Sequence, residues 1–557
     1  MLKDGIAGLE EAAHDLCVVG AGPVGVALAT NLARRGRRVL VLESGGTNAE
    51  PDIQDLSSAM LLDPKHHDDM MIAVARRLGG TSNLWGGRCL PYDPIDFERR
   101  DWVDARWPIG IGDIQPYLGK AALATLSGEP TYREPIPELS LIDNSFSCDT
   151  LERWANTTAA QTIHSEELAK NPKLDLRTHA TLTGIDFSES GRVQAINITH
   201  SKTGERIRLR IDTLVIAAGG LESARLLLAT QRSCPSRFGG EDGPLGRTYM
   251  GHLVGEIADI VFTRDVFERA FDFHVDLHGS YVRRRIAASA DIQRKNQLLN
   301  AAFWPVVPPI GDARHGSAIL SLVYLAMSFG PLGRLLVAEV IRRRQVSSGS
   351  SRRAPHFANV LTGLPAALAF GYNFMRRRYM HHMRLPGLFI YNRAHRYGLS
   401  YHAEQAPRRD SRVRLSEETD RLSVPKLIID YRFCAQDAQS VIKSHSLLEA
   451  WLQHNNLGHL EYRVRPEERA AAILDQACHG THQIGLARMG YGRNDAVVDA
   501  NLQTFDASNL YVASTAVLPT SSQANPTLTA VALALRLADH LAMKETTELR
   551  GKTTSAH

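Results

Sequence analysis

Three glycines near the N-terminus constrain this chain more than any other feature. An apolar run of strand character is followed by Gly20-Ala-Gly22-Pro-Val-Gly25, which is a G-x-G-x-x-G motif. Residues 26–36 then predict a helix that ends in glycine, and residues 38–42 predict a second buried strand that ends at Glu43. A strand, a glycine-rich turn, a helix and a strand in this order are typical of the first βαβ unit of a dinucleotide-binding domain.

Each glycine of the motif has its own physical role. Gly20 permits the tight turn, Gly22 lets the backbone approach a pyrophosphate, and Gly25 lets the helix pack closely on the strand. The N-terminus of the helix attracts the anion. Glu43 lies 18 residues after Gly25, and its carboxylate can accept hydrogen bonds from ribose hydroxyls. The motif therefore predicts a bound nucleotide, and by itself it leaves FAD and NAD as alternatives.

Length and charge narrow the class of protein. The chain has 557 residues, enough for two or more domains, and its net charge of +4 does not indicate nucleic-acid binding. None of the six cysteines forms a C-x-x-C pair, which favours reduced thiols in the cytosol. The first residues lack the apolar core of a signal peptide, so we expect a cytoplasmic protein.

A second glycine-rich segment follows at residues 77–88. Its sequence, Arg-Leu-Gly-Gly-Thr-Ser-Asn-Leu-Trp-Gly-Gly-Arg, combines four glycines with two hydroxyls and an amide. Such a loop can turn its backbone N–H groups towards a planar ring or a phosphate. A tight turn between a helix and a strand is the alternative interpretation of the same residues.

Several segments in a fixed order resemble the glucose-methanol-choline (GMC) family of FAD-dependent oxidoreductases. They are the loop at 77–88, the strand-turn-helix at 214–227, the Gly-Arg segment at 245–252, the His482-x-x-Gly-x-x-x-Met-Gly run and the segment Asn525-Pro-Thr527. The segment at 245–252 departs from the family pattern by carrying Thr248 for Asn and Gly251 for Asp. The resemblance spans about residues 14–540, with a poorly matched middle.

The resemblance implies an FAD-dependent oxidation of an alcohol. The cofactor would contact Gly20, Gly22, Gly25, Glu43, Thr81, Asn83, Gly219 and Thr527. In the family a histidine takes the hydroxyl proton while the flavin takes the hydride at N5, and His482 matches that histidine. A histidine that only hydrogen-bonds beneath the flavin is the alternative role for His482. His479 lies three residues earlier, but no carboxylate partner is evident and we expect no metal.

Asn525 has two possible roles. In the family the matching residue is His or Asn and faces the substrate, and the His/Asn pair occurs in branches that oxidise sugars and sterols. Asn before Pro526 is also a favourable N-cap for the helix predicted from residue 528. Some sugar oxidases of the family attach FAD through a histidine just before the tryptophan of the loop. Here Leu84 has that position, so we expect non-covalent FAD.

The middle of the chain contains two apolar runs flanked by arginine clusters, within residues 317–384. They suit the surface of a membrane, and an insertion of packed helices with solvated basic ends is the alternative. They are too short, or too often interrupted by Gly and Pro, to be predicted as membrane-spanning helices. We therefore expect peripheral contact on the inner face of the membrane as one possible role for this segment.

These observations predict an α/β fold of the GMC type. A Rossmann-like FAD-binding domain would comprise residues 10–260 and 470–545, and an α+β substrate domain residues 261–469. The expected reaction is oxidation of a secondary hydroxyl of a sugar or glycoside, with His482 as base and Asn525 on the substrate oxygen. The alternatives are a sterol or other hydrophobic alcohol oxidase and a non-catalytic flavin-binding subunit.

Overall fold

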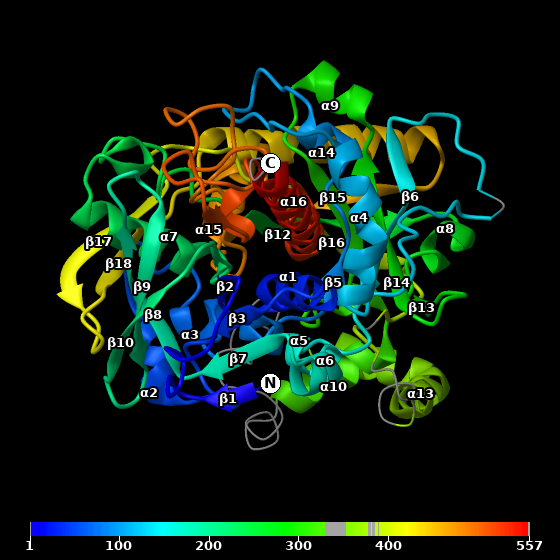
Figure 1. Cartoon of the computed structure of the whole chain (residues 1–557). Coiled ribbons are helices and arrows are strands. Elements are labelled where there is room, and N and C mark those ends of the chain that lie inside the picture. Colours follow the sequence, from blue (N-terminus) through cyan, green and yellow to red (C-terminus); the bar gives the residue numbers. More distant parts are fainter. Residues whose placement is uncertain are drawn as a thin grey trace.

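A six-stranded parallel sheet forms one half of the molecule (Figure 1). The computed structural model describes residues 2–137, 139–328, 353–376, 380, 385–387 and 389–554. The order of the strands in this sheet is β1-β7-β3-β2-β11-β20, and every neighbouring pair is parallel. The strands are β1 (Leu2–Asp4), β7 (Leu174–Thr178), β3 (Val39–Leu42), β2 (Leu16–Val19), β11 (Leu214–Ile216) and β20 (Leu510–Val512).

The predicted βαβ unit is present at the centre of this sheet. All residues of β2 and β3 are buried, as expected for parallel strands that are covered on both faces. Between them runs α1 (Pro23–Arg34), which begins earlier than the predicted residue 26 because Pro23 suits the first helical position. Helix α1 packs against α16 (Thr527–Thr554), which in turn packs against α4 (Ile111–Ala124). The fold class predicted from the sequence is confirmed.

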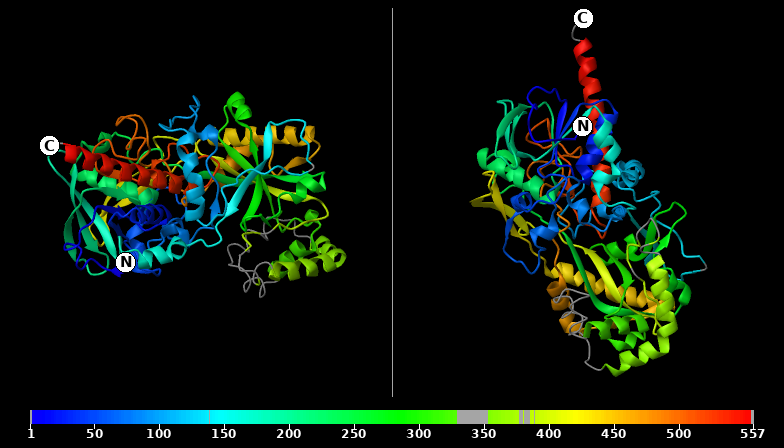
Figure 2. Two further views of the ribbon diagram at one scale, coloured as in Figure 1. Left: turned by 45° about the vertical axis from the view of Figure 1, so that its right-hand side comes forward. Right: turned by 90° about the horizontal axis from the view of Figure 1, so that it is seen from below.

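An eight-stranded, largely antiparallel sheet forms the second half (Figure 2). Its path is β19-β12-β16-β15-β14-β6-β5, and β13 pairs with β14 outside that path. The strands are β19 (Gly458–Tyr462), β12 (His252–Phe262), β16 (Arg396–Glu404), β15 (Ala301–Val306), β14 (Tyr281–Ala288), β6 (Phe146–Trp154), β5 (Arg88–Cys89) and β13 (His274–Val275).

Helices lie on both sides of the eight-stranded sheet (Figure 2). On one side α14 (Ala435–His454) buries Val441, Leu448 and Trp451 against apolar residues of β12, β15 and β16. On the other side lie α10 (Ala318–Ser328) and α13 (Ala354–Met375), which pack against each other. The remaining helices are α2 (Pro51–Gln54), α3 (Met70–Ala73), α5 (Ala160–Ile163), α6 (Ser165–Lys170), α7 (Gly219–Ser233), α8 (Asp265–Arg269), α9 (Ala290–Asn296) and α15 (Arg469–Gln476).

Two small three-stranded sheets complete the fold. One is an antiparallel meander of β8 (Ala180–Phe187), β9 (Val193–His200) and β10 (Arg206–Arg210). The other pairs β17 (Arg412–Thr419) with β18 (Pro425–Asp430), and β18 with β4 (Ala59–Leu61). The sheets do not follow the sequence-based division at residues 260 and 470, because β5 and β6 join the eight-stranded sheet and β17–β18 pair with β4.

The insertion at residues 317–384 contains the described helices α10 and α13. Within it, residues 329–352, 377–379 and 381–384 lie outside the described part of the chain, and the arginines at 342–344, 377 and 378 are among them. Within the residues that the structure describes, no helix combines the length and the apolar character needed to cross a bilayer.

Candidate active site

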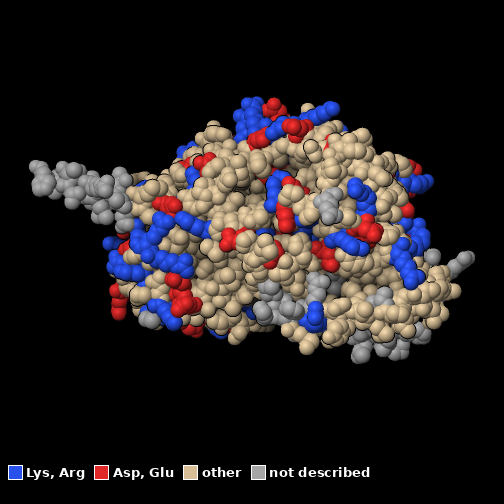
Figure 3. Space-filling view, turned by 90° about the vertical axis from the view of Figure 1, so that its right-hand side faces the viewer, with Lys and Arg blue, Asp and Glu red and all other residues tan. Residues whose placement is uncertain are grey.

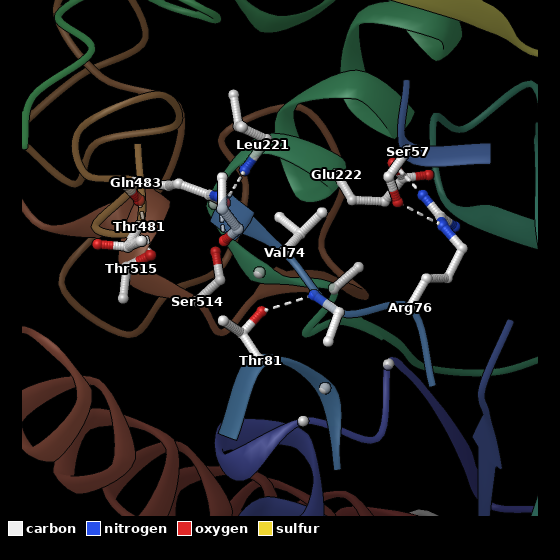
Figure 4. A pocket seen from close by; sticks show the side chains of 18 of the residues that line it. Ser57, Val74, Arg76, Thr81, Leu221, Glu222, Thr481, Gln483, Ser514 and Thr515 are labelled. Atoms are coloured by element: carbon white, nitrogen blue, oxygen red, sulfur yellow. Dashed lines mark hydrogen bonds and ion pairs between the residues drawn. The ribbon is translucent and has the colours of Figure 1, made fainter. Parts of the chain in front are cut away.

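A cavity of about 930 Å³ opens at the carboxyl ends of β2 and β11 (Figure 4). Carboxyl ends of parallel strands are the usual ligand site in a doubly wound sheet. The six-stranded sheet and its loops contribute one wall, and β6, β12 and β16 contribute Trp154, Val254 and His402 to the other. The C-terminal loops close the cavity with residues 478–479, 481–483, 514–515 and 525–527.

The glycine motif forms a cradle that a side chain would fill. Gly20 has φ +101°, and a Cβ there would lie 2.6 Å from the carbonyl oxygen of Ala217. A Cβ on Gly25 would lie 2.0 Å from the carbonyl oxygen of Gly20, which agrees with the predicted packing role of Gly25. Gly22 lines the cavity, and a Cβ on Gly22 would meet no atom within 4 Å. Gly219, at the start of α7, also lines the cavity.

Glu43 lies where the sequence predicts it, at the end of β3 and in the wall of the cavity. Its two carboxylate oxygens accept hydrogen bonds from the backbone N–H groups of Ala21 (3.0 Å) and Gly45 (2.9 Å). Burial raises the pKa of Glu43 above its ordinary value, while these N–H donors oppose the shift. Each oxygen can still accept a further hydrogen bond. The cradle and this acid together fit a nucleotide with its ribose hydroxyls at Glu43.

The loop at residues 77–88 places Thr81 and Asn83 differently. Thr81 lines the cavity, and its hydroxyl accepts a hydrogen bond from the backbone N–H of Ala75 at 3.2 Å (Figure 4). The Asn83 amide instead donates to the carbonyl oxygens of Leu78 (3.0 Å) and Gly80 (2.8 Å). Asn83 is not among the residues that line the cavity. Its side chain holds the loop in shape, and a direct contact between Asn83 and the cofactor stays a prediction.

Sequence reasoning missed two groups that shape the cavity (Figure 4). Arg76 pairs with Glu222 at 2.7 Å and donates through Nε to the Ser57 hydroxyl at 2.8 Å. Burial alone would raise the pKa of Glu222, but the cations of Arg76 and Arg225 hold it below its usual value. Arg76 directly precedes the glycine-rich loop and Glu222 is in the strand-turn-helix at 214–227, so both motifs pointed to their neighbourhood.

The second missed group anchors the C-terminal loop beneath His482. The Gln483 side chain accepts a hydrogen bond from the backbone N–H of Leu221 at 3.0 Å, at the start of α7. The Thr515 hydroxyl donates to the Gln483 carbonyl oxygen at 2.6 Å (Figure 4). These bonds tie the residue next to His482 to the end of the parallel sheet, so the backbone at His482 is held from two sides.

The structure brings His482 and Asn525 together. The Asn525 amide Nδ2 lies 3.1 Å from Nε2 of His482, and both residues line the cavity with Thr527. The Asn525 Oδ1 atom is buried and has no hydrogen-bond partner, so the side chain does not cap α16 in this structure. That orphaned acceptor and the His482 ring both belong to the cavity wall.

A chain of hydrogen bonds sets the tautomer of His482. Nε2 of His252 lies 3.0 Å from the Ser521 carbonyl oxygen, which can only accept, so His252 carries its proton on Nε2. The His252 Nδ1 atom is then an acceptor for Nδ1–H of His482, at 2.9 Å. His482 consequently keeps an unprotonated Nε2 on the side of Asn525. His252 ends the segment at 245–252, and no pattern in the sequence indicated this role.

Burial keeps His482 neutral. Burial, followed by repulsion from His479, His252 and the cations of Arg88 and Arg285, lowers the pKa of His482 well below its ordinary value. The neutral ring is therefore the form present at pH 7 and above. Its unprotonated Nε2 accepts a hydrogen bond from the Asn525 amide in this structure, and a substrate hydroxyl that took the place of this donor could pass its proton to Nε2.

An ion cluster on the eight-stranded sheet lies behind the histidines. The buried carboxylate of Glu152 accepts hydrogen bonds from Nε of Arg283 (2.6 Å) and Nε of Arg285 (2.7 Å). Arg88, which lines the cavity, lies 3.5 Å from the same carboxylate. Burial opposes ionisation, but the three guanidinium groups hold the pKa of Glu152 at about 2. Three cations around one anion leave positive charge near the cavity, which favours a developing anion there.

Four histidines meet in this region: His252, His402, His479 and His482. Their candidate ligand atoms all lie within 4.8 Å of one another. The rings of His252 and His402 are stacked, with centroids 4.0 Å apart and planes inclined by 19°. Both ring nitrogens of His252 are in hydrogen bonds, with the Ser521 carbonyl oxygen and with His482, so His252 could bind an ion only if one of these bonds were broken. The expected absence of a metal stays a prediction.

Comparison with known proteins places these features in a family context. Residues 407–534 match the family model described as GMC oxidoreductase, and residues 18–48 match an NAD(P)-binding Rossmann-like domain. The solved structure of pyridoxine 4-oxidase from Mesorbium loti is similar in fold, with a TM-score of 0.55 and 18% identity over 95% of this chain and 99% of that chain.

Three curated relatives illustrate the range of similar sequences. The 6'''-hydroxyparomomycin C oxidase of Streptomyces lividus is 25% identical over 44% of this chain, and the chain spans only 56% of that relative's length. The 2-methyl-1,2-propanediol dehydrogenase of Mycolicibacterium austroafricanum is 21% identical over 98% of each chain. The C-glycoside 3-oxidase of Microbacterium trichothecenolyticum is 42% identical over 69 residues, which are 12% of this chain and 13% of that relative.

The structure of the cradle predicts different effects of substitution at Gly25, which is needed for packing, and at Gly22, which faces the nucleotide site. Gly25→Ala should lower the stability of the protein without its nucleotide by about 1–3 kcal/mol, the usual cost of overpacking, because its Cβ would meet the Gly20 carbonyl oxygen. Gly22→Ala is the matched control, since its φ of −76° is ordinary and its Cβ would meet nothing within 4 Å. It should melt like the parent protein without nucleotide and bind the nucleotide more weakly. Equal melting of both variants without nucleotide would contradict this assignment.

Proposed function

Because the chain belongs to the GMC oxidoreductase family, we propose that it oxidises a secondary hydroxyl of a sugar or glycoside with non-covalently bound FAD. The family implies FAD, and the bound cofactor would supply the acceptor for the hydride. The observation that carries the proposal is the pair of His482 and Asn525 in the wall of a cavity whose other end has the nucleotide cradle. The choice of a glycoside as substrate is supported by two relatives, which are named as oxidases of a C-glycoside and of hydroxyparomomycin.

In this proposal His482 takes the proton of the substrate hydroxyl at Nε2. The hydrogen bond to His252 keeps the proton of the neutral ring on Nδ1, so Nε2 is available. Asn525 would hold the substrate oxygen, and its amide could turn to offer either Nδ2 or the unpartnered Oδ1. The positive charge of the cluster around Glu152 would stabilise the alkoxide that forms as the proton leaves.

The wall that faces the eight-stranded sheet supports a polar ring substrate. His402 donates through Nδ1 to the Gln523 carbonyl oxygen at 2.6 Å, so its Nε2 atom can accept a hydrogen bond from a hydroxyl. The ring of Trp154 offers a flat apolar surface to the face of a sugar. Met71 and Ile72 also line the cavity and are 61% and 60% exposed, which supports the alternative of a sterol or other hydrophobic alcohol.

The non-covalent attachment of FAD rests on Leu84, which lines the cavity at the position of the attaching histidine in some sugar oxidases. An aliphatic side chain cannot form the bond to the flavin. Purified protein should therefore be yellow, and acid precipitation should release all of the colour as FAD, identified by chromatography. Flavin that remains in the washed pellet would overturn this part of the proposal.

The reaction itself is tested by anaerobic bleaching of the flavin with a panel of sugars, glycosides, sterols and aliphatic alcohols. A glycoside should reduce the wild-type flavin fastest, and His482→Ala should slow that reduction by about 10²–10⁴-fold, the usual contribution of a general base. Because the pKa of His482 is lowered, the wild-type rate should stay level above pH 6.5 and fall only on the acid side. Fastest bleaching by a sterol would favour the hydrophobic alternative, and no bleaching by any alcohol would favour a non-catalytic flavin-binding subunit.

The role of His252 is tested by two substitutions. His252→Leu removes the acceptor for Nδ1–H of His482, and flavin reduction should slow by about tenfold, the cost of one lost buried hydrogen bond. In His252→Asn, the amide oxygen can replace Nδ1 as acceptor, so this variant should retain more activity. FAD content and melting temperature are the controls for folding. Equal rates in the two variants would show that the hydrogen bond does not position His482.

A further inference from the structure

Helix α13 carries an apolar face that points away from the rest of the described protein. Its exposed residues are Phe357, Leu361, Leu364, Leu368, Tyr372 and Met375, with exposed fractions between 45% and 80%. Their spacing of three or four residues places them along one side of the helix. Exposed apolar patches of this length on a folded protein mark interaction sites.

Contacts with α10 determine which side of α13 faces outward. His356 is stacked on Tyr324 with ring centroids 4.0 Å apart, and its Nδ1 atom lies 3.1 Å from the Ser321 hydroxyl. The Asn359 amide donates to the same hydroxyl at 3.1 Å and to the Ala313 carbonyl oxygen at 2.9 Å. These buried polar contacts are specific in direction, so the helix cannot rotate to bury its apolar face without breaking them.

The inner side of α13 also packs closely against α10. A Cβ on Gly363 would lie 2.7 Å from the Cβ of Ala318, so α13 and α10 meet at a glycine. Arg393, which lies shortly before β16, donates a hydrogen bond to the Thr362 carbonyl oxygen at 3.0 Å. The apolar side of α13 therefore stays exposed because the contacts on its opposite side fix the orientation of the helix.

Charge distinguishes this part of the chain from the remainder. Helix α13 contains no Asp, Glu, Lys or Arg, and the chain places Arg353 before it and Arg376 after it. Residues 313–403 contain 13 arginines, no lysine and one glutamate, for a net charge of +12. The rest of the chain is then −8, because the whole chain is +4. Helix α13 lies at the lower right in Figure 1, and in Figure 3, which faces that side of the molecule, the residues drawn in colour at the lower right are mostly uncharged.

We propose that the outer face of α13 binds the surface of an anionic lipid bilayer. The apolar face of the helix could enter the boundary between headgroups and acyl chains, while the arginines at its two ends could contact the anionic headgroups. A second copy of the chain is the less suitable occupant, since a two-fold interface along α13 would bring the cations of Arg353 and Arg376, at the two ends of the helix, against those of the other copy. The helix lies on the bilayer rather than across it, because no described helix is long and apolar enough to span.

This proposal is independent of the substrate and is tested with the holoenzyme. Vesicles of phosphatidylcholine, with or without phosphatidylglycerol, are sedimented with the protein at low and high salt. The wild type should pellet with the anionic vesicles at low salt and less at high salt, because salt screens the arginines. It should pellet weakly with phosphatidylcholine alone.

Two leucines provide the decisive variant. Leu361→Glu combined with Leu368→Glu should reduce partitioning into anionic vesicles by about tenfold or more, because two apolar groups that would enter the bilayer become charged. Leu123→Glu on α4 is the matched control, as Leu123 is 70% exposed on a helix away from α13 and should leave binding unchanged. Absorbance of bound FAD and the melting temperature verify that both variants are folded.

Three outcomes would overturn the proposal. The first is a wild type that does not pellet with anionic vesicles at low salt, and the second is a double variant that pellets as well as the wild type. The third is a wild-type dimer in analytical ultracentrifugation that dissociates in the double variant while neither binds vesicles. That last result would assign the α13 face to a second copy of the chain.

Discussion

The candidate active site depends on the hydrogen bond between Nδ1 of His482 and Nδ1 of His252. It joins a C-terminal loop to β12 of the eight-stranded sheet, and the Ser521 carbonyl oxygen fixes its direction. Because burial lowers the pKa values of both rings, the chain of donors and acceptors holds one proton per ring. The neutral His482 ring then has its unprotonated Nε2 beside Asn525, whose amide donates to it. A single protonation would break this order of donors and acceptors.

The same region explains two departures from the family pattern. A Cβ on Gly251 would lie 2.5 Å from the Tyr431 hydroxyl oxygen and 2.9 Å from Nδ1 of His479, so the aspartate of the pattern would not fit without movement. Thr248 has φ +57°, a conformation that asparagine adopts more readily than threonine. Its hydroxyl donates to carbonyl oxygens of Arg247 (2.7 Å) and Gly485 (3.1 Å), which compensates locally. Gly251 thus leaves room for Tyr431 and His479 beside His252.

Apolar residues are buried in the strands beside the nucleotide cradle, whereas many apolar residues of the insertion are exposed. In β2 and β3 every residue is buried beneath helices, and the motif glycines let α1 approach the sheet. In α13 many apolar residues are left exposed, because the inner face is formed by other residues, namely His356, Asn359, Gly363, Phe370 and Phe374. Hydropathy alone does not distinguish the two cases, since it records how much is apolar and not which side is covered.

The sequence by itself determined the βαβ unit, the fold class and the identity of the nucleotide cradle. These features depend on local rules, namely the steric freedom of Gly20 and Gly25 and the run of buried strand residues beside them. It also marked His482 and Asn525 as candidates, although their sequence separation left their distance open. Only the tertiary structure decided that the Asn525 amide meets His482 instead of capping α16. It alone placed His252 and His402 beside them, because strands β12 and β16, which carry these two residues, pair with each other across the sheet.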